Sequence, residues 1–255
     1  MAMKFASKIN QLLAILLFVS LLGCASNSLQ NEAKVLSKKD TPEILVDTMS
    51  YIPKRIVDEE TGLLIPYQTS TNPYLKKAGR IEASLVAEFI SARRAYQNGA
   101  YQKAKDVLER LTSQDDTLSG PWVMLGDIAQ KNKKPKEAIK NYVRAIEINK
   151  NNVNAYIRLA KVRRQLGDFI SSQNTYKRAL AIWKDFPEAH LNLAILYDIY
   201  LNKPIMSQRH LEAYLFLTYG RDKKHASWLE ELQQRTGKEI QLEVDIKKAI
   251  SETTS

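Results

Sequence analysis

The 255-residue sequence contains one cysteine, Cys24, so the chain cannot form an internal disulfide, and its redox compartment cannot be read from disulfides. Histidine is also scarce, and none of the 3 histidines forms an H-x₃-H pair that could hold a metal on one helix. A Gly-rich phosphate loop and a G-x-S-x-G motif are missing. These absences argue against an enzyme, and we expect no catalytic residue, no metal site and no cofactor.

Negative charge is the scarcer sign. The chain has 38 Lys and Arg residues against 28 Asp and Glu residues, which gives a net charge of +10. This excess favours anionic partners such as lipid headgroups or acidic proteins, and it is equally compatible with solubility alone. The positive charge is spread along the chain without a recognised nucleic-acid-binding motif, so we expect no nucleic-acid partner.

A long apolar run is also missing. Residues 12–22 read LLAILLFVSLL, whereas a membrane-spanning helix needs about 20 apolar residues. With Lys4 and Lys8 before it, the run has the charged and apolar regions of a secretory signal peptide. It ends in Leu21-Leu22-Gly23-Cys24 instead of the common small-x-small cleavage site. An ordinary signal peptide that happens to end near a cysteine is the alternative interpretation.

These four residues resemble the lipobox of bacterial lipoprotein precursors. The resemblance implies that residues 1–23 are cleaved, that Cys24 receives a diacylglyceryl thioether, and that its new amine is acylated, for example with palmitate. A single acyl chain anchors only marginally, so several chains on one residue would hold the protein at a membrane. Ala25, rather than Asp, follows the cysteine, which in enterobacterial lipoproteins indicates the outer membrane. We therefore expect a lipid-anchored protein that faces the periplasm.

Two segments separate the cysteine from the rest of the chain. Residues 24–50 are predicted to form a polar, flexible tether. Residues 51–80 contain three prolines and three tyrosines and are expected to be extended and to lie against the folded part. Within them, RIVDEETGLLIPY places two apolar runs around an acidic turn that ends in Gly62, which predicts a hairpin over Ile56–Ile65.

The strongest signal is a period of 34 residues. The blocks that begin at Trp122, Tyr156 and His190 follow one another at this offset, and a weaker copy begins at Glu88. Within each block, large apolar residues recur three and four positions apart, so they fall on one face of a helix. Small residues recur at positions where two helices would cross closely. The period therefore predicts four similar helix pairs.

The pattern resembles the tetratricopeptide repeat (TPR), a helix–turn–helix unit of 34 residues. The second block carries the motif best, at Trp122, Leu125, Gly126, Ala129, Ala138, Tyr142 and Ala145. In the fourth block, the motif positions of the second helix are assigned to Met206, His210 and Ala213. The resemblance implies an all-α, right-handed solenoid over residues 81–220, with repeats at 85–118, 119–152, 153–186 and 187–220.

The ends of the solenoid carry their own signals. Residues 221–237 are predicted to form a capping helix that begins after Asp222 and ends at Gly237. In the tail, residues 238–255, KEIQLEVDIKK alternates apolar and polar residues, which is typical of a strand. That strand could pair with Ile56–Ile65 or with the sheet edge of another protein, and a short helix packed on the cap is the alternative.

In TPR proteins the first helix of each repeat lines the concave face. The resemblance therefore implies a partner-binding groove at Phe89, Arg93, Tyr96, Val123, Asp127, Gln130, Ile157, Lys161, Arg164, Leu191, Ile195 and Asp198. The alternative is that several of these residues pack against residues 51–80. His190 and His210 are expected to be core or groove residues rather than ligands, because they occupy aromatic positions of the fourth repeat.

The expected function is that of a non-catalytic envelope adaptor, which binds another envelope protein or peptide through this groove. A pilotin-like role in type IV pilus or secretin assembly, and delivery of peptidoglycan-processing enzymes, are alternatives. Lipid binding through the basic surface is a third class. The sequence leaves the oligomeric state open.

Overall fold

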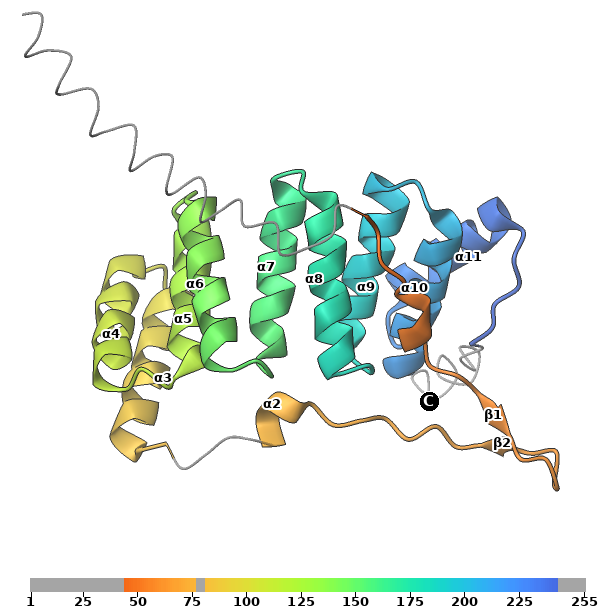
Figure 1. Ribbon diagram of the computed structural model, residues 1–255, viewed down its shortest axis with the longest axis horizontal. Coiled ribbons are helices and arrows are strands. Elements are labelled where there is room, and N and C mark those ends of the chain that lie inside the picture. The colour runs from red at the N-terminus through yellow and green to blue at the C-terminus, as the bar shows by residue number, and fades with distance from the viewer. Residues whose placement is uncertain (1–43, 77–80, 243–255) are drawn as a thin grey trace, which may run out of the picture. The chain divides into compact units, whose positions relative to one another are not determined.

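The computed structural model describes residues 44–76 and 81–242. The described residues belong to the second of the chain's two units, Glu43–Ser255. The predicted signal peptide, Cys24 and most of the predicted tether lie outside the described residues. The described part of the second unit consists mainly of helices (Figure 1).

Four helix pairs follow one another along the second unit. They are α3 (Ala83–Gln97) with α4 (Tyr101–Gln114), α5 (Ser119–Lys131) with α6 (Pro135–Ile148), α7 (Val153–Gln165) with α8 (Phe169–Ile182), and α9 (Pro187–Ile195) with α10 (Pro204–Leu217). The second helix of each pair also contacts the first helix of the next pair, and α11 (Lys223–Thr236) packs on α10. This consecutive stacking confirms the predicted all-α TPR solenoid with a capping helix (Figure 1).

The turn between the two helices of each repeat contains a residue with positive φ, and these residues recur at the 34-residue period in the first three repeats. Gly99 and Gly167 end the first helices of their repeats with φ of 76° and 81°, a conformation that glycine adopts without steric cost. Lys133 takes the equivalent place in the second repeat, with φ of 58°. In the fourth repeat this place falls to Asn202, one residue later than the period predicts.

A single π-helical turn, η2 (Leu196–Tyr200), causes this shift. The backbone N–H of Leu201 bonds to the carbonyl of Leu196, so the turn closes over five residues and inserts one extra residue. The predicted register of α10 is therefore wrong by one position. Ser207, not Met206, takes the small position, and its hydroxyl donates to the carbonyl of Ala194 as Ser172 does to Ala160. Leu211, not His210, follows Tyr142 and Tyr176 in the repeat.

The core runs through the stacked helices in three apolar clusters. Helices α5 and α6 pack closely at Gly126 on α5, where an added Cβ would lie 2.3 Å from Cε1 of Tyr142 on α6. At the other end of the stack, Leu229 and Leu232 of α11 bury against Leu211 and Leu215. The predicted caps of α11 are confirmed: Asp222 accepts from the backbone N–H of His225, and Gly237 has φ of 62°.

The segment before the solenoid is mostly extended, as predicted, and contains two short helices, η1 (Met49–Tyr51) and α2 (Pro73–Lys76). The predicted hairpin is confirmed. Strand β1 (Ile56–Val57) pairs antiparallel with β2 (Leu64–Ile65), and Gly62 closes the turn with φ of 68°.

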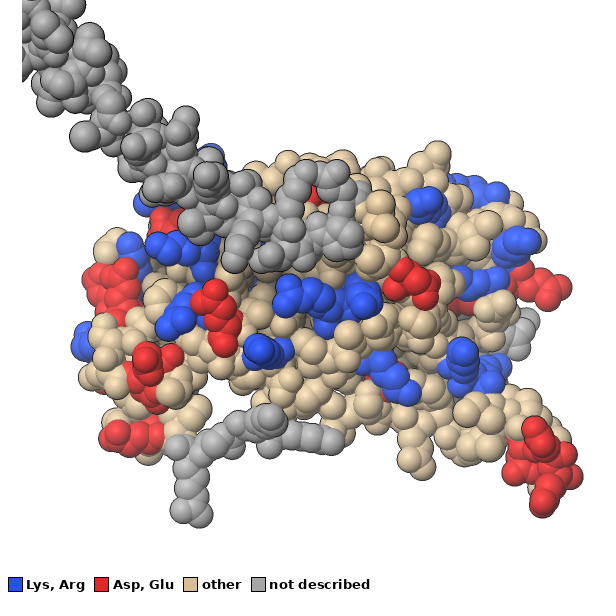
Figure 2. Space-filling model, viewed as in Figure 1, with Lys and Arg blue, Asp and Glu red and all other residues tan. Residues whose placement is uncertain are grey.

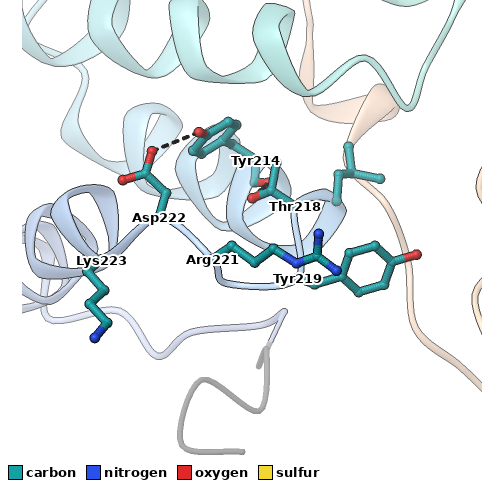
Figure 3. Close-up of a pocket in the computed structure, with 7 residues that line it drawn as sticks. Tyr214, Thr218, Tyr219, Arg221, Asp222 and Lys223 are labelled. Atoms are coloured by element: carbon teal, nitrogen blue, oxygen red, sulfur yellow. Dashed lines mark hydrogen bonds between the residues drawn. The ribbon is translucent and has the colours of Figure 1, made fainter. Parts of the chain in front are cut away.

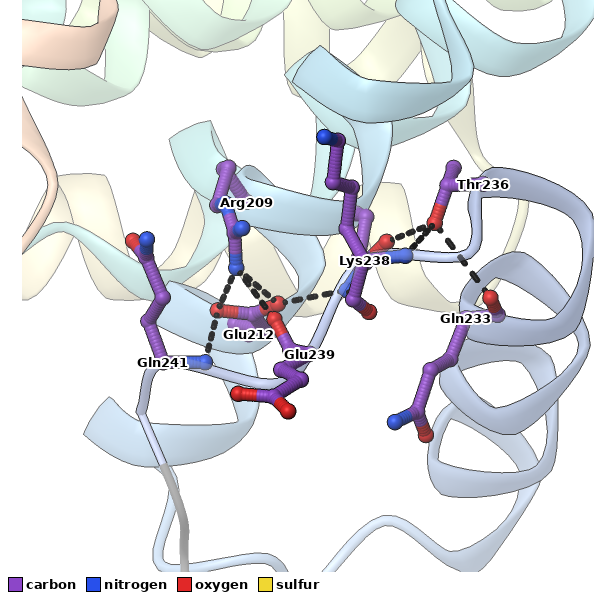
Figure 4. Close-up of polar contacts among 8 residues, drawn as sticks. Arg209, Glu212, Gln233, Thr236, Lys238, Glu239 and Gln241 are labelled. Atoms are coloured by element: carbon purple, nitrogen blue, oxygen red, sulfur yellow. Dashed lines mark hydrogen bonds and ion pairs between the residues drawn. The ribbon is translucent and has the colours of Figure 1, made fainter.

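The tail after α11 does not form the predicted strand in its described part. Residues 238–242 lie along α10, held by Gln208, Arg209 and Glu212, of which Arg209 and Glu212 form a buried ion pair at 2.8 Å (Figure 4). Arg209 donates to the carbonyl of Glu239, and the backbone N–H of Gln241 donates to Glu212. In the part of the chain that the structure describes, the hairpin forms a two-stranded sheet, so the predicted pairing with the tail is not formed there. Residues 243–255 lie outside the described residues.

Candidate functional site

All twelve predicted groove residues lie on the first helices of the repeats, α3, α5, α7 and α9, or on η2. Two of them do not reach the surface: Val123 is 8% exposed and Ile157 is 0% exposed, and both belong to the core. Ile157 is covered because α7 contacts the neighbouring first helices, α5 and α9, as well as its own partner. The other ten residues are at least partly exposed and define what we call the first-helix face.

Charged side chains of the first-helix face join consecutive repeats. The bridges connect Asp127 to Arg158 (2.8 Å), Lys161 to Glu188 (2.6 Å) and Asp198 to Arg235 of the capping helix (2.9 Å). Each bridge is partly exposed to solvent, so each contributes at most about 1 kcal/mol to stability. These bridges link the second repeat to the third, the third to the fourth and the fourth to the capping helix, and they commit three of the predicted groove charges to internal contacts.

Two other side chains of the first-helix face have an unsatisfied donor. Nε2 of Gln130 and Nη1 of Arg164 are buried and lack a hydrogen-bond partner among the residues that the structure describes. The two residues are equivalent positions of neighbouring repeats, on α5 and α7. The guanidinium of Arg164 also lies over the ring of Tyr200, at 5.7 Å from its centre. A buried donor without an acceptor costs about 1–3 kcal/mol, so a side-chain rotation that brings either donor to an acceptor on a bound ligand would recover that cost.

The extended N-terminal segment binds elsewhere. Asp185, in the turn between α8 and α9, accepts hydrogen bonds from the hydroxyl of Tyr67 and from the backbone N–H and hydroxyl of Ser70, each at 2.6 Å. Burial raises the pKa of Asp185, but the bonds from Ser70 and Tyr67 outweigh it, so the pKa lies below its usual value. The ring of Tyr67 also packs edge-on against Phe216 of α10.

A second attachment lies at Thr48. Its hydroxyl is 2.8 Å from the hydroxyl of Tyr197 and 2.8 Å from Nε2 of His210. Gln173 of α8 donates to the carbonyl of Val46 and to Tyr197. None of the partners in the two attachments is a predicted groove residue. The segment approaches the predicted groove at Phe89, since both Phe89 and Tyr74 of α2 lie 3.7 Å from where a Cβ on Gly120 would be.

The contact at Thr48 continues into a buried histidine pair. Nδ1 of His190 lies 3.0 Å from Nδ1 of His210, and Nε2 of His190 lies 2.9 Å from the carbonyl oxygen of Lys184. Both rings are fully buried. Burial lowers the pKa of His190 to about 4 and, together with the charge of its neighbour, lowers the pKa of His210 well below 6.5. Both are core residues, as predicted, although His210 does not occupy the aromatic position of its helix.

A further hollow lies at the turn between α10 and α11 (Figure 3). Tyr214 donates to Asp222 at 2.9 Å, and burial together with this carboxylate raises the pKa of Tyr214 to about 12. Asp222 is also the cap of α11, so these groups have a structural use. No group of three His, Cys, Asp or Glu side chains in the described ranges could hold a metal. Among the helices described, none is long and apolar enough to cross a bilayer.

Comparison with known proteins agrees with this architecture. Residues 126–167 match the family described as "TPR repeat", and residues 153–182 match "Tetratricopeptide repeat". No curated protein matches the sequence. The chain therefore carries TPR units, which generally bind protein partners.

Solved structures give the same class. A MamA protein is 13% identical with a TM-score of 0.51, covering 68% of this chain and 90% of its own. The pilF protein of Pseudomonas aeruginosa is 16% identical with a TM-score of 0.54, covering 60% and 68%. A thermophilic TPR protein of Thermus thermophilus, TTC0263, is 17% identical with a TM-score of 0.51, covering 64% and 86%. At these identities the likeness shows the fold, a TPR solenoid, and nothing finer.

Proposed function

We propose that this protein is a non-catalytic adaptor of a bacterial cell envelope, which binds a segment of another envelope protein along its first-helix face. The observation that carries the proposal is the pair of unsatisfied donors at Gln130 and Arg164. Leu191 and Ile195 lie on the next first helix, α9, and are partly exposed. The face therefore offers donors beside apolar side chains, which suits an extended or helical peptide with carbonyl or carboxylate groups and apolar anchors.

Photo-crosslinking tests this proposal. A photoreactive residue at Ile195 should capture a defined protein in intact cells, and Gln130→Ala with Arg164→Ala should lower that capture about tenfold, since the lost bonds are worth about 1–3 kcal/mol. The matched control position is Arg178, which is exposed on the second helix α8. Equal capture from Arg178, or capture at Ile195 that the double variant leaves unchanged, would contradict the proposal.

The envelope location rests on the SLLGCASNS stretch, which supports a lipid anchor at Cys24. Cys24→Ser should move the protein from the membrane fraction to the soluble fraction, or stall it as an uncleaved precursor. Ser28→Ala, four residues along the same polar segment, is the control and should stay in the membrane fraction. Fractionation with mass measurement of the N-terminus decides the matter, and an unchanged membrane fraction in Cys24→Ser would exclude the anchor.

Two pathways fit this adaptor. In a pilotin-like role, a deletion strain should show altered secretin multimers, whereas delivery of peptidoglycan-processing enzymes predicts altered peptidoglycan fragments. Lipid binding through the basic surface is the third class. Capture that persists at high salt favours a protein partner, because charge attraction to a lipid surface is screened.

A further inference from the structure

The β1–β2 hairpin exposes apolar side chains on both of its faces. Opposite residues of an antiparallel pair point to the same side, so Ile56 and Ile65 share one face while Val57 and Leu64 share the other. The hairpin residues that are 48–69% exposed are Ile56, Val57, Leu63, Leu64 and Ile65. A two-stranded hairpin with two uncovered apolar faces is a surface that a partner would stabilise.

The hairpin is held in place at its tip and at its base. At the tip, Asp58 accepts from the backbone N–H groups of Glu60 and Thr61 and from the hydroxyl of Thr61. At the base, the segment is attached to the solenoid before the hairpin at Thr48 and after it at Tyr67. A preformed hairpin loses little conformational freedom when it binds. Less of the free energy gained by burying its apolar side chains is therefore offset by lost entropy, and more of it contributes to affinity.

The tip is acidic. Asp58, Glu59 and Glu60 follow one another, and none of the three forms an ion pair within the described residues. Figure 2 shows acidic side chains gathered where the hairpin lies in Figure 1. Unpaired carboxylates are costly to bury in a bilayer, so the tip argues against membrane insertion. An apolar surface with basic residues at its edge fits this hairpin best.

Helix α3 presents such a surface. As the first helix of the first pair, it packs on α4 and α5, while Val86 and Ile90 remain 40% and 43% exposed. Arg93 and Arg94 are exposed one turn further along the same stripe and form no ion pair in the described residues. Glu88, the acid of this helix, is already bonded to Arg110 at 3.0 Å.

We propose that the hairpin of one chain binds the exposed face of α3 in a second copy, which joins chains head to tail. The attachments of the hairpin are on α8, α10 and the turn after α8, whereas α3 begins the stack, so α4 to α7 separate the two surfaces within one chain. The contact is therefore between molecules, and its two surfaces differ. Heterologous contacts of this kind build rings or open chains.

Charge exchange tests the contact on the full chain in neutral-detergent micelles. Sedimentation over a range of protein concentrations should show that the unchanged chain self-associates. The double variant Glu59→Lys with Glu60→Lys should weaken this association about tenfold, and the double variant Arg93→Glu with Arg94→Glu should weaken it equally. All four changes in one chain should restore association, because both signs are then reversed. Lys136→Glu with Lys140→Glu, two exposed residues of α6 with the same change in charge, should leave it unchanged.

Crosslinking on the otherwise unchanged chain gives an independent result. A photoreactive residue at Leu63 should form a product of twice the chain mass, with the link mapped to residues 83–97. A chain that sediments as one molecule at every concentration, four changes that do not restore association, or links from Leu63 to lipid or to another protein would each overturn the proposal. The Ile195 capture experiment does not depend on this contact, so the two proposals can fail separately.

Discussion

Gly126→Ala is expected to lower the free energy of unfolding by about 3 kcal/mol, at the upper end of the cost of overpacking a core. The new Cβ would lie 2.3, 2.6 and 2.8 Å from three ring carbons of Tyr142. The ring cannot move aside, because it is 1% exposed and its hydroxyl donates to Asp127 at 2.8 Å. Helices α5 and α6 would have to separate, and denaturant unfolding followed by circular dichroism measures the cost.

Gly120→Ala, on the same helix, is the matched control. Its Cβ would meet Phe89 and Tyr74 at 3.7 Å, which is ordinary contact, and its backbone is helical. Alanine there should change stability by less than about 1 kcal/mol, in the favourable direction, since alanine is the better helix former. If Gly126→Ala unfolds at the same denaturant concentration as Gly120→Ala, the close crossing of α5 and α6 is wrong.

The helix pairs were predictable because their determinants are local and repeat. Gly126, the turn glycines and the proline at the start of α6 each mark one position of the 34-residue helix–turn–helix repeat. The cap of α11 is equally local, since Asp222 bonds a backbone group three residues away. Sequence patterns of this kind can be recognised without knowledge of the tertiary contacts.

The register of α10 was not predictable from the period. The offset of 34 residues holds through α9 and ends at η2, where one residue is inserted. The period assigns His210 to an aromatic position and Ala213 to a small position of the repeat. Both residues suit these positions, so they give no sign of the insertion. Ser207 was a usable signal, since a small residue stands directly beside the anomalous Met206.

The long-range contacts had no periodic signal at all. Asp185 and Thr48 belong to a turn and to the predicted tether, and each acquires its role from partners more than a hundred residues away. The tail shows the same limit. Its alternation predicts a strand, but Leu242 is buried and the preceding backbone bonds to side chains of α10 instead of another strand. The residues of the first-helix face were predicted from their positions in the repeat. The sequence alone did not show that Ile157 is buried while the other predicted residues of α7 are partly exposed.

The buried histidine pair predicts a loss of stability in mild acid. The carbonyl of Lys184 can only accept, so Nε2 of His190 carries the hydrogen and its Nδ1 accepts from Nδ1 of His210. Nε2 of His210 then accepts from the hydroxyl of Thr48, which accepts from Tyr197. Each donor in this row has one acceptor when both rings are neutral. A proton added to Nδ1 of His190 would set two N–H groups against each other, and a proton added to Nε2 of His210 would displace the hydroxyl hydrogen of Thr48 from its acceptor.

The direction of the change in stability with pH follows from the lowered pKa values of the two histidines. Above pH 6.5 the rings are neutral in both states, and their contribution to stability is fully present. Between pH 6.5 and about 4 the unfolded chain binds protons that the folded chain does not, so stability falls as pH falls. By pH 5 the loss is about 2 kcal/mol for His190, at 1.36 kcal/mol per pKa unit, and the loss for His210 has the same sign.

Unfolding free energies at pH 7 and at pH 5 measure this loss while carboxylates of ordinary pKa stay ionised. His210→Gln should be less stable at pH 7, because the row of hydrogen bonds is broken, but should lose less stability on acidification than the unchanged chain. His225→Gln removes the third histidine, which lies outside the row on α11 and bonds to Asp222 at 2.6 Å, so this variant should still lose stability through the buried pair on acidification. Cleavage by added protease between Ile52 and Asn72 should rise with the same pH dependence, because Thr48 attaches this segment to His210. An equal loss on acidification in His210→Gln and in the unchanged chain would show that the neutral pair does not set the acid sensitivity.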